Sequence, residues 1–536
     1  MDTKESIIAK PDLSDNGVNV NADDDLLASF GYKPELKRNF TRFEIFGLGF
    51  SIIGILPSLA SVLVYSIPYG GAVAMVWGWA ICGLFLMCLA LAMAELGSAV
   101  PTSGGLYFWT FMFSSPKWRH FLAWTVAYTN TIGQISSVAS VDWGCAVQIM
   151  AAVSIAKPTF HPTTAQTFGV YCLVLLLHVW ICTQSPALVA RLQWGYVALN
   201  LLVAFAVIIA VPVATPPELR NSAAYVFGNF TNLTTWTNGF AFILSFMSPL
   251  WAVGGFDSQV HISEEARNAN VAIPYGIILA TFSGIMLGWG LNIALAFSMG
   301  SDTQNIMNNS IGQPFATILF NSFGQRGTLI LWAFIVILQF TMGSSMLTAA
   351  SRQIFAFSRD GGLPFSRYLY KVDHRVYAPV RCVWFVAAAA LLLGLLSFAG
   401  TNAIGAVFSL VICSQNFSYA VPIIARFLGG QDLKRGPFHL GKLSQPIAAI
   451  AVTWLIFTMV VFLFPANSEP DAPNMNYAVV VMGGVLLLST AYFYCPKYGG
   501  NYWFTGPVRT ISPSAVDSDL RNDICSHPSN ETHVGI

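Results

Sequence analysis

Residues 47–58 read GLGFSIIGILPS, which is part of an apolar stretch that glycine and proline interrupt. In a lipid bilayer a helix must satisfy its own backbone groups, so such an interruption survives only where protein or a cavity satisfies the freed groups. A second stretch of this kind, SPLWAVGGFD, occupies residues 248–257 and ends in an acid. Two interrupted apolar helices predict a binding cavity inside a membrane-embedded bundle.

The rest of the chain consists of further apolar blocks of helix length. Of its 536 residues 55% are hydrophobic and 10% are charged, whereas ordinary soluble domains carry about 25% charged residues. Because each span needs about 20 apolar residues, we expect an all-α polytopic membrane protein with twelve transmembrane helices. These are expected near residues 43–66, 71–97, 121–153, 165–184, 187–213, 239–262, 274–299, 327–356, 379–398, 402–425, 446–464 and 476–495.

The interrupted helices are the first and the sixth of this series, at matching positions of two five-helix halves. That arrangement is typical of inverted-repeat transporters, although a pair of ordinary kinks is the alternative. We expect repeats over 43–213 and 239–425, two more helices over 446–495, and tails over 1–42 and 496–536. Half-helix N-termini attract anions and C-termini attract cations, so the two breaks favour a zwitterionic substrate.

The distribution of basic residues predicts the orientation. With the N-terminus placed in the cytoplasm, Lys157, Arg220 and Arg326 fall outside, and the other 23 of 26 Lys and Arg fall inside. Both tails are then cytoplasmic and are expected to be disordered over about 1–30 and 510–536. Asn229 and Asn232 begin glycosylation sequons in a predicted outer loop, which is compatible with the secretory route. We expect an integral protein of the plasma membrane, with the vacuolar membrane as the alternative.

Several function classes are disfavoured by composition. The net charge of +1 gives no bulk attraction to nucleic acid. We find no nucleophile–base pairing, metal-ligand cluster or phosphate-binding loop, so an enzyme, a metal site and a cofactor are not expected. A nutrient receptor that binds without transporting remains an alternative, but both tails are too short for a signalling domain. The oligomeric state is left open.

Two acids lie deep inside predicted spans, where a carboxylate is costly and usually functional. Asp257 follows the second break and is a candidate for proton exchange; its alternative role is to cap the half-helix that follows. Asp142 is a candidate partner for a substrate ammonium group, or else a hydrogen-bonded structural acid. Trp251 and Phe256 flank the second break, where aromatic faces can hold an ammonium group or simply pack.

Other polar residues supply mid-membrane polarity. Each is either a substrate contact or an interhelical hydrogen bond, and we select Tyr128, Gln339, Ser344 and Gln415 as candidate substrate residues, together with Gly254 and the first break at Ile53, Gly54 and Ile55. Glu264 and Glu265, with Arg267, are expected to form an inner salt-bridge gate, or else a solvated run of charges. His178 is expected to be a satisfied, neutral core histidine.

Three motifs then resemble those of the amino acid–polyamine–organocation transporter family. They are Trp251 to Asp257 followed by Ser263-Glu-Glu-Ala-Arg267, the loop Pro101-Thr-Ser-Gly-Gly-Leu-Tyr107, and Ser358-Arg-Asp-Gly-Gly-Leu-Pro364. Residues 31–38, 50–58, 256–261 and 436–441 most resemble the fungal GABA permease and choline permease branch, and the GABA permease more closely. The resemblance implies the five-plus-five fold of the leucine transporter with two extra helices.

The resemblance also implies functional roles. Trp251 matches the family's aromatic lid, Asp257 its acid linked to pH sensing or proton coupling, and Ile53–Ile55 its carboxylate cradle. The cradle departs from the usual Gly-Ser-Gly, and Asn200 replaces a lysine of some bacterial members. We therefore expect a secondary transporter that imports GABA or a related amino acid with protons as coupling ion. Choline, thiamine and polyamines are the alternative substrates.

Overall fold

The computed structural model describes residues 20–373, 375–465, 467–469 and 475–511. These fall into two compact units, of which one spans residues 36–508 and holds every predicted transmembrane helix. The other contains residues 20–35 and 509–511 of the described chain. In this small unit α1 (Val20–Ser29) leads to Gly31, whose carbonyl accepts a hydrogen bond of 2.8 Å from the Thr510 amide.

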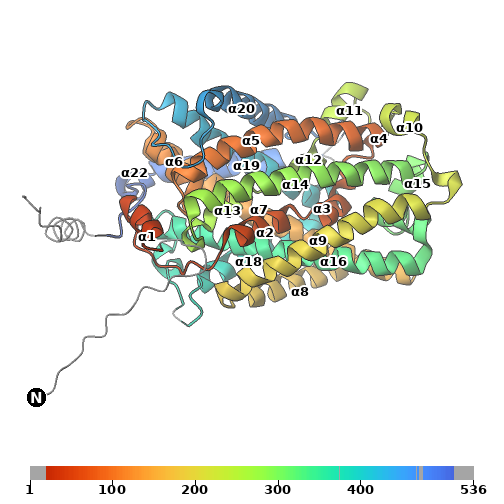
Figure 1. Cartoon of the computed structure of the whole chain (residues 1–536), viewed down its shortest axis with the longest axis horizontal. Helices are drawn as coiled ribbons and strands as arrows, with labels where there is room; N and C mark the ends of the chain where they lie inside the picture. Colours follow the sequence, from red (N-terminus) through yellow and green to blue (C-terminus); the bar gives the residue numbers. More distant parts are fainter. Residues whose placement is uncertain (1–19, 374, 466, 470–474, 512–536) are drawn as a thin grey trace, which may run out of the picture. The chain divides into compact units, whose positions relative to one another are not determined.

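The larger unit is a bundle of helices with one short strand pair (Figure 1). The first half contains α2 (Arg42–Ile53), α3 (Ile55–Val62), α4 (Gly71–Val73), α5 (Trp79–Ala99), α6 (Gly105–Phe113), α7 (Arg119–Ala156), α8 (Thr164–Cys182), α9 (Pro186–Ala214) and α10 (Ala223–Gly228). Next come α11 (Asn238–Leu244), α12 (Met247–Ala252), α13 (Ser258–His261), α14 (Ala269–Ser298), α15 (Thr303–Met307), α16 (Pro314–Arg359), α17 (Ser366–Leu369), α18 (Val380–Gly394) and α19 (Thr401–Leu428). The last helices are α20 (Ser444–Val461), α21 (Ala478–Tyr494) and α22 (Gly500–Trp503).

Within the described residues ten helices are long and apolar enough to cross a membrane. Two shorter apolar segments, Asn238–Ala252 and Ala478–Tyr494, lie where the sixth and twelfth spans are predicted. The all-α polytopic fold with broken first and sixth spans is therefore confirmed. The breaks divide α2 from α3 and α12 from α13.

The structure differs from the prediction in three segments. Residues 314–323 form an additional helical segment before Gly324, whose φ of 66° separates it from the predicted eighth span. The sixth span is interrupted a second time at Ser245 and Phe246, between α11 and α12, and Pro249 lies in the first turn of α12 directly after this interruption. Residues 20–29 form α1 although disorder was expected there, while 1–19 and 512–536 lie outside the described residues.

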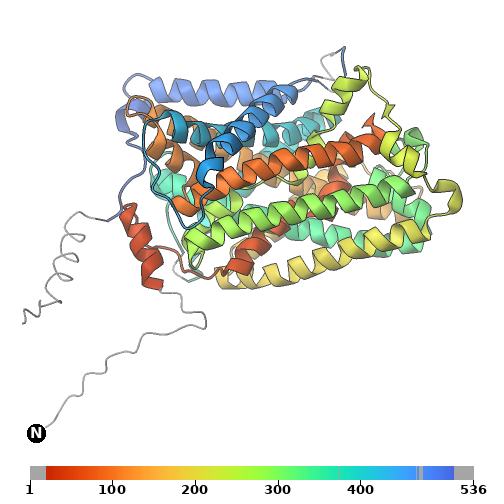
Figure 2. The ribbon, with the colours of Figure 1, turned by 45° about the horizontal axis from the view of Figure 1, so that its top comes forward.

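The packing pairs helices of the two halves. α5 packs along α14, and α7 packs along both α16 and α19. Figure 2 shows α5 and α14 running side by side over their lengths. α8 and α18 cover the α7–α16 layer, while α20 packs on α5 and α19. The two broken helices are enclosed, since α2 contacts α14, α9 and α16, and α12 contacts α3, α5 and α19.

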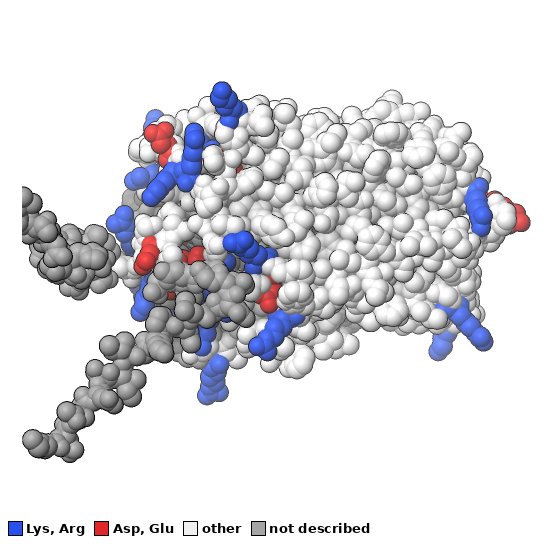
Figure 3. All heavy atoms as spheres, in the orientation of Figure 1, with Lys and Arg blue, Asp and Glu red and all other residues white. Residues whose placement is uncertain are grey.

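The two ends of the bundle differ in charge (Figure 3). We call the end at which α2 begins and α5 and α16 finish the basic end, because most of the Lys and Arg visible in that view gather there. We call the opposite end the strand end. There β1 (Tyr69–Gly70), which follows the first broken span, pairs antiparallel with β2 (Thr231–Asn232), which precedes the sixth.

Candidate functional site

The first break centres on Gly54. Its backbone lies in the left-handed region at φ 46°, where an L side chain costs about 1–2 kcal/mol. A Cβ atom at this position would lie 2.9 Å from the Met342 sulfur. α3 starts directly after the break, and the Ser58 hydroxyl donates a 2.6 Å hydrogen bond to the Ile53 carbonyl. Pro57 has no amide hydrogen, so the backbone donors left at this helix N-terminus are those of Ile55 and Leu56.

The second break spans Val253 to Asp257, between α12 and α13. Gly255 adopts a φ of 85°, again in the region that favours glycine. A Cβ atom on Gly255 would lie 3.1 Å from the side chain of Ile52 in the last turn of α2. The last turn before the first break therefore lies close to the second break.

A small cavity lies between the breaks, and only about 20 Å³ of it admits the centre of a water-sized sphere. Its lining combines hydroxyl, amide, thioether and aliphatic groups with one indole ring, and none of the lining side chains is charged. The lining residues are Ile52, Ser137, Ser140, Val141, Trp251, Gly254, Gly255, Met342, Met346, Val411 and Gln415. Of the residues selected from the sequence, Trp251, Gly254 and Gln415 line this cavity.

Trp251 and Gln415 are held in place by their neighbours. The Trp251 ring lies 5.1 Å from the Phe408 ring, centroid to centroid, and the residue is only 6% exposed. The Gln415 amide donates to the Ser137 hydroxyl at 3.2 Å. α12, α19 and α7 thus meet at the cavity through these contacts, and the indole forms part of its wall.

Asp142 lies away from this cavity. Its Oδ1 is 3.0 Å from Nδ1 of His178, and both side chains are fully buried. The other ring nitrogen of His178 lies 2.8 Å from the Phe340 carbonyl. Gly343 makes room for the pair, because a Cβ atom there would collide with both side chains. The contact favours the interpretation of Asp142 as a structural acid between α7, α8 and α16.

Four other selected residues also make contacts outside the cavity lining. Gln339 donates to the Val141 carbonyl at 2.9 Å, and the Ser344 hydroxyl donates to a carbonyl of its own helix. The Tyr128 hydroxyl donates to the Gly362 carbonyl at 2.8 Å, in the loop after α16. The Phe256 ring packs 6.0 Å from the Tyr419 ring.

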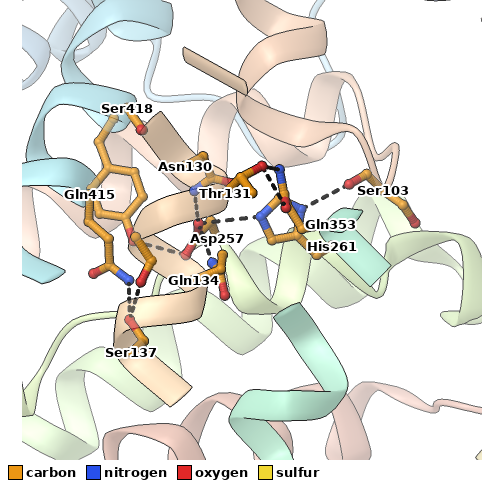
Figure 4. A network of polar contacts seen from close by, with 12 residues as sticks. Ser103, Asn130, Thr131, Gln134, Ser137, Asp257, His261, Gln353, Gln415 and Ser418 are labelled. Carbon is orange, nitrogen blue, oxygen red and sulfur yellow. Dashed lines mark hydrogen bonds and ion pairs between the residues drawn. The ribbon is translucent and has the colours of Figure 1, made fainter. Parts of the chain in front are cut away.

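Asp257 lies just behind the second break, surrounded by donors (Figure 4). Its Oδ2 accepts hydrogen bonds of 2.7 Å from both Asn130 and Gln134 on α7, and lies 3.3 Å from Nε2 of His261. Its Oδ1 accepts a 2.9 Å bond from the Tyr419 hydroxyl on α19. The carboxylate makes no capping bond to α13, so the capping role considered for it is not the one that the geometry supports.

Comparison with known proteins agrees with this architecture. Residues 40–485 match the family model described as amino acid permease. The chain belongs to the amino acid permease family. It is 35% identical to the GABA-specific permease of Saccharomyces cerevisiae, over 94% of this chain and 90% of that protein. It is 37% identical to an uncharacterized amino-acid permease of Schizosaccharomyces pombe, over 92% and 89% of the two chains, and 34% identical to amino-acid permease 2 of Neurospora crassa, over 94% and 92%.

Buried ion pairs join two segments of the permease at its basic end. Arg359 binds Glu264 through two hydrogen bonds of 2.8 and 2.9 Å, and Arg352 binds Glu265 at 2.7 Å. Both pairs join the segment after α13 to the last turns of α16. Arg267, which was grouped with these acids, instead donates to the backbone carbonyl of Arg38. The two glutamates therefore belong to a buried group of ion pairs and not to a solvated run of charges.

Loop 100–104 of the permease connects the Glu264–Arg359 ion pair to His261, the neighbour of Asp257. The Ser103 amide donates to Glu264 at 3.1 Å, and the Ser103 carbonyl lies 2.9 Å from Nδ1 of His261. Burial alone would raise the pKa of the Glu264 carboxyl, but Arg359 and the Ser103 amide outweigh it and hold that pKa below its usual range.

Sequence reasoning missed the partners of Asp257. His261 follows Asp257 by four residues, one turn further along a helix, and this spacing was the available signal. Gln134 and Tyr419 come from other helices, and only the packing of α7 and α19 against the break brings them to the carboxylate.

Proposed function

We propose that this integral membrane permease imports GABA or a closely related small amino acid, coupled to protons, by alternating access. The observation that carries the proposal is the pair of helix breaks that face one cavity whose lining has no charged side chain. The fungal relative named as GABA-specific, at 35% identity, supports GABA as the proposed substrate over other amino acids.

Backbone groups supply the charge complement of a zwitterion. The N-terminus of α3 offers the amides of Ile55 and Leu56 and the positive end of a helix dipole to a carboxylate. α12 ends at Ala252, so its last carbonyls and the face of Trp251 are available to an ammonium group. The carbon chain of GABA separates its carboxylate from its ammonium group. This separation suits a carboxylate site at the first break and an ammonium site at the second.

The same cavity is poorly suited to choline, thiamine or a polyamine. Such cations require a carboxylate counter-charge in a site of low dielectric. Asp142 faces His178, and Asp257 accepts hydrogen bonds from three side chains beside its contact with His261. Neither acid lines the cavity.

The proposed cycle uses the two halves of the fold. We assign residues 43–213 and 239–425 to the two inverted repeats and residues 446–495 to the additional helices. The basic end faces the cytoplasm, in keeping with the retention of Lys and Arg on that side, and the plasma membrane is the proposed location. Glu264 and Glu265 close the inner path, and Trp251 closes over the substrate.

The test is uptake of radiolabelled GABA by cells that express the full chain, compared with cells that express an inactive control. Uptake is measured with and without a protonophore, and with excess choline, putrescine or α-amino acids as competitors. We expect GABA to accumulate, the protonophore to abolish accumulation, and close analogues alone to compete.

Two results would overturn parts of this proposal separately. Accumulation of choline or putrescine without GABA would refute the substrate and redirect attention to Asp142. If GABA accumulates equally with and without the protonophore, the proton coupling is refuted. Saturable GABA binding to membranes without any uptake would instead support the alternative of a non-transporting receptor.

A further inference from the structure

We propose that Asp257 and His261 bind a single proton as a unit, that His261 carries it, and that this proton holds the basic end closed. This rests on the proton coupling proposed above and makes it more specific. It assigns the coupled proton to His261 instead of Asp257, and it links that proton to opening of the basic end.

The hydrogen-bond partners of His261 determine where its ring hydrogens lie. Nδ1 is 2.9 Å from the Ser103 carbonyl, and a carbonyl can only accept, so Nδ1 carries a hydrogen. Nε2 lies 3.3 Å from Oδ2 of Asp257. Two lone pairs cannot face each other at this distance without repulsion, so one further proton lies between His261 and Asp257.

The other partners of Asp257 assign that proton to the histidine. Asn130 and Gln134 donate to Oδ2, the same oxygen that faces His261, and Tyr419 donates to Oδ1. A carboxylate that receives several donors is stabilised in its ionised form. The geometry therefore describes a carboxylate beside an imidazolium, a buried ion pair whose net charge is zero.

Charge balance across the buried region agrees with this assignment. Asp257 and His261, Glu264 and Arg359, and Glu265 and Arg352 form three pairs of opposite charge, each almost fully buried. A neutral His261 would leave Asp257 as an uncompensated buried charge, which is strongly destabilising.

Ser103 joins the proton site to the gate. Its carbonyl accepts from His261 and its amide donates to Glu264, which Arg359 holds through two hydrogen bonds. Loop 100–104, the start of α13 and the end of α16 are therefore connected by one chain of hydrogen bonds. Figure 4 shows the Asp257–His261–Ser103 portion of this chain.

Release of the proton breaks the chain at a defined place. Nε2 of His261 transfers its proton to water, and the ring becomes neutral while Asp257 stays ionised. The lone pair on Nε2 then faces the lone pairs of Oδ2, so the ring must leave either Asp257 or Ser103. In both cases the segment between the break and Glu264 loses an anchor, which favours opening of the basic end.

The groups that face this site are accounted for on each packed element. α14 carries no charged side chain, and Tyr419 is the titratable group that α19 directs at Asp257. On α16 the charged neighbours are Arg352 and Arg359, both paired with glutamate. On α2 the charged residues are Arg42 and Glu44, both in its first turn, where Glu44 accepts a hydrogen bond from the Thr41 amide.

The first experiment uses the full-length permease in proteoliposomes with radiolabelled GABA. His261→Gln is compared with wild type in two modes, exchange of GABA at equal pH and accumulation driven by an inward proton gradient. We expect the variant to keep exchange, to lose gradient-driven accumulation and to lose the pH dependence of exchange. Accumulation with the wild-type pH profile would overturn the proposal.

The matched control is His178→Gln, which applies the same substitution to an equally buried histidine beside an acid. Apart from its contact with His178, Asp142 accepts no hydrogen bond from a described residue, so that pair lacks the amide and hydroxyl donors that surround Asp257. We expect His178→Gln to keep the ratio of accumulation to exchange and the pH profile. If His178→Gln also loses gradient-driven accumulation and the pH dependence of exchange, loss of any buried histidine would explain the result at His261, and the proposal would be overturned.

A second experiment needs no transport and separates this inference from the proposed function. Unfolding midpoints are measured for Asp257→Asn, His261→Gln and the double variant. An ion pair predicts that each single variant loses stability and that the neutral double variant recovers part of it, and purely additive losses would refute the pair. If His261→Gln does not fold, the double variant enters the transport test. If a proton gradient does not drive accumulation in the wild type, the proposed proton coupling is refuted. The comparison of the single and double variants still tests whether Asp257 and His261 form an ion pair.

Discussion

Two buried histidines of this permease face carboxylates in different surroundings. Asp257 receives hydrogen bonds from Asn130, Gln134 and Tyr419, whereas Asp142, apart from its contact with His178, accepts none from a described residue. The two acids are equally buried and differ in the number of their hydrogen-bond donors. Sequence reasoning recognised both acids because each interrupts an apolar span, but it could not count their partners.

At Trp251 the structure predicts a loss of substrate affinity on removal of the aromatic ring. A cation–π contact contributes about 0.5–2 kcal/mol, which corresponds to a roughly 2- to 30-fold rise in the KM for GABA in Trp251→Leu. Initial rates of labelled GABA uptake, corrected for surface expression, provide the measurement. Trp251→Phe keeps a ring and should lose less, and equal losses in both variants would argue against an ammonium contact.

The two adjacent sequons differ in the exposure of their acceptor nitrogens. Asn229 is exposed, whereas Asn232 is half-buried and its Nδ2 donates to the Trp236 carbonyl at 2.8 Å. We expect Asn229→Gln to remove a glycan and Asn232→Gln to leave glycosylation unchanged. Electrophoretic mobility before and after endoglycosidase treatment measures this, and a mobility shift in Asn232→Gln alone would contradict the prediction.

At the scale of elements, the break at Gly54 combines a left-handed backbone with a close sulfur contact. Gly54→Ala should therefore lose about 1–2 kcal/mol of stability from the backbone alone, and should lose most GABA uptake because α3 is displaced. Thermal unfolding and uptake are the measurements. Gly483→Ala in α21 is the control, since a Cβ atom there meets no neighbour within 4 Å and should be tolerated.

Element positions were largely predictable because a membrane helix must be long and apolar. The same criterion missed residues 314–323, which are too short to span and are separated from the rest of α16 by Gly324. It also missed the interruption at Ser245 and Phe246, which lies about one turn before Pro249. Of the candidate site residues, Trp251 and Gly254 at the second break and Gln415 on α19 line the cavity, whereas Ile53, Gly54 and Ile55 at the first break do not. Gln339, Ser344 and Asp142 contact other partners.

At the scale of the whole molecule, the Glu264–Arg359 pair predicts acid sensitivity. Because the pKa of Glu264 is lowered in the folded state, its stabilising contribution is complete above the ordinary carboxyl pKa of about 4.3 and is lost as the pH falls through the lower folded value. Glu264→Gln should lower the unfolding midpoint at neutral pH and flatten its dependence on acid. Midpoints measured across that pH range test this.

Glu218→Gln is the matched control, because Glu218 is exposed in the segment after α9. It should leave both the midpoint and its pH dependence unchanged. A wild-type midpoint that stays constant into strong acid would contradict the assigned role of Glu264.

The pairing of β1 with β2 has a consequence for the movement of the bundle. Tyr69–Gly70 follows the first broken span and Thr231–Asn232 precedes the sixth, so a backbone ladder fastens the outer continuations of both spans to each other. The two spans cannot part from one another at the strand end without breaking that ladder. We therefore expect them to travel there as a single rigid body, and a path for solute at that end to appear between this body and the layer of α7, α16 and α19.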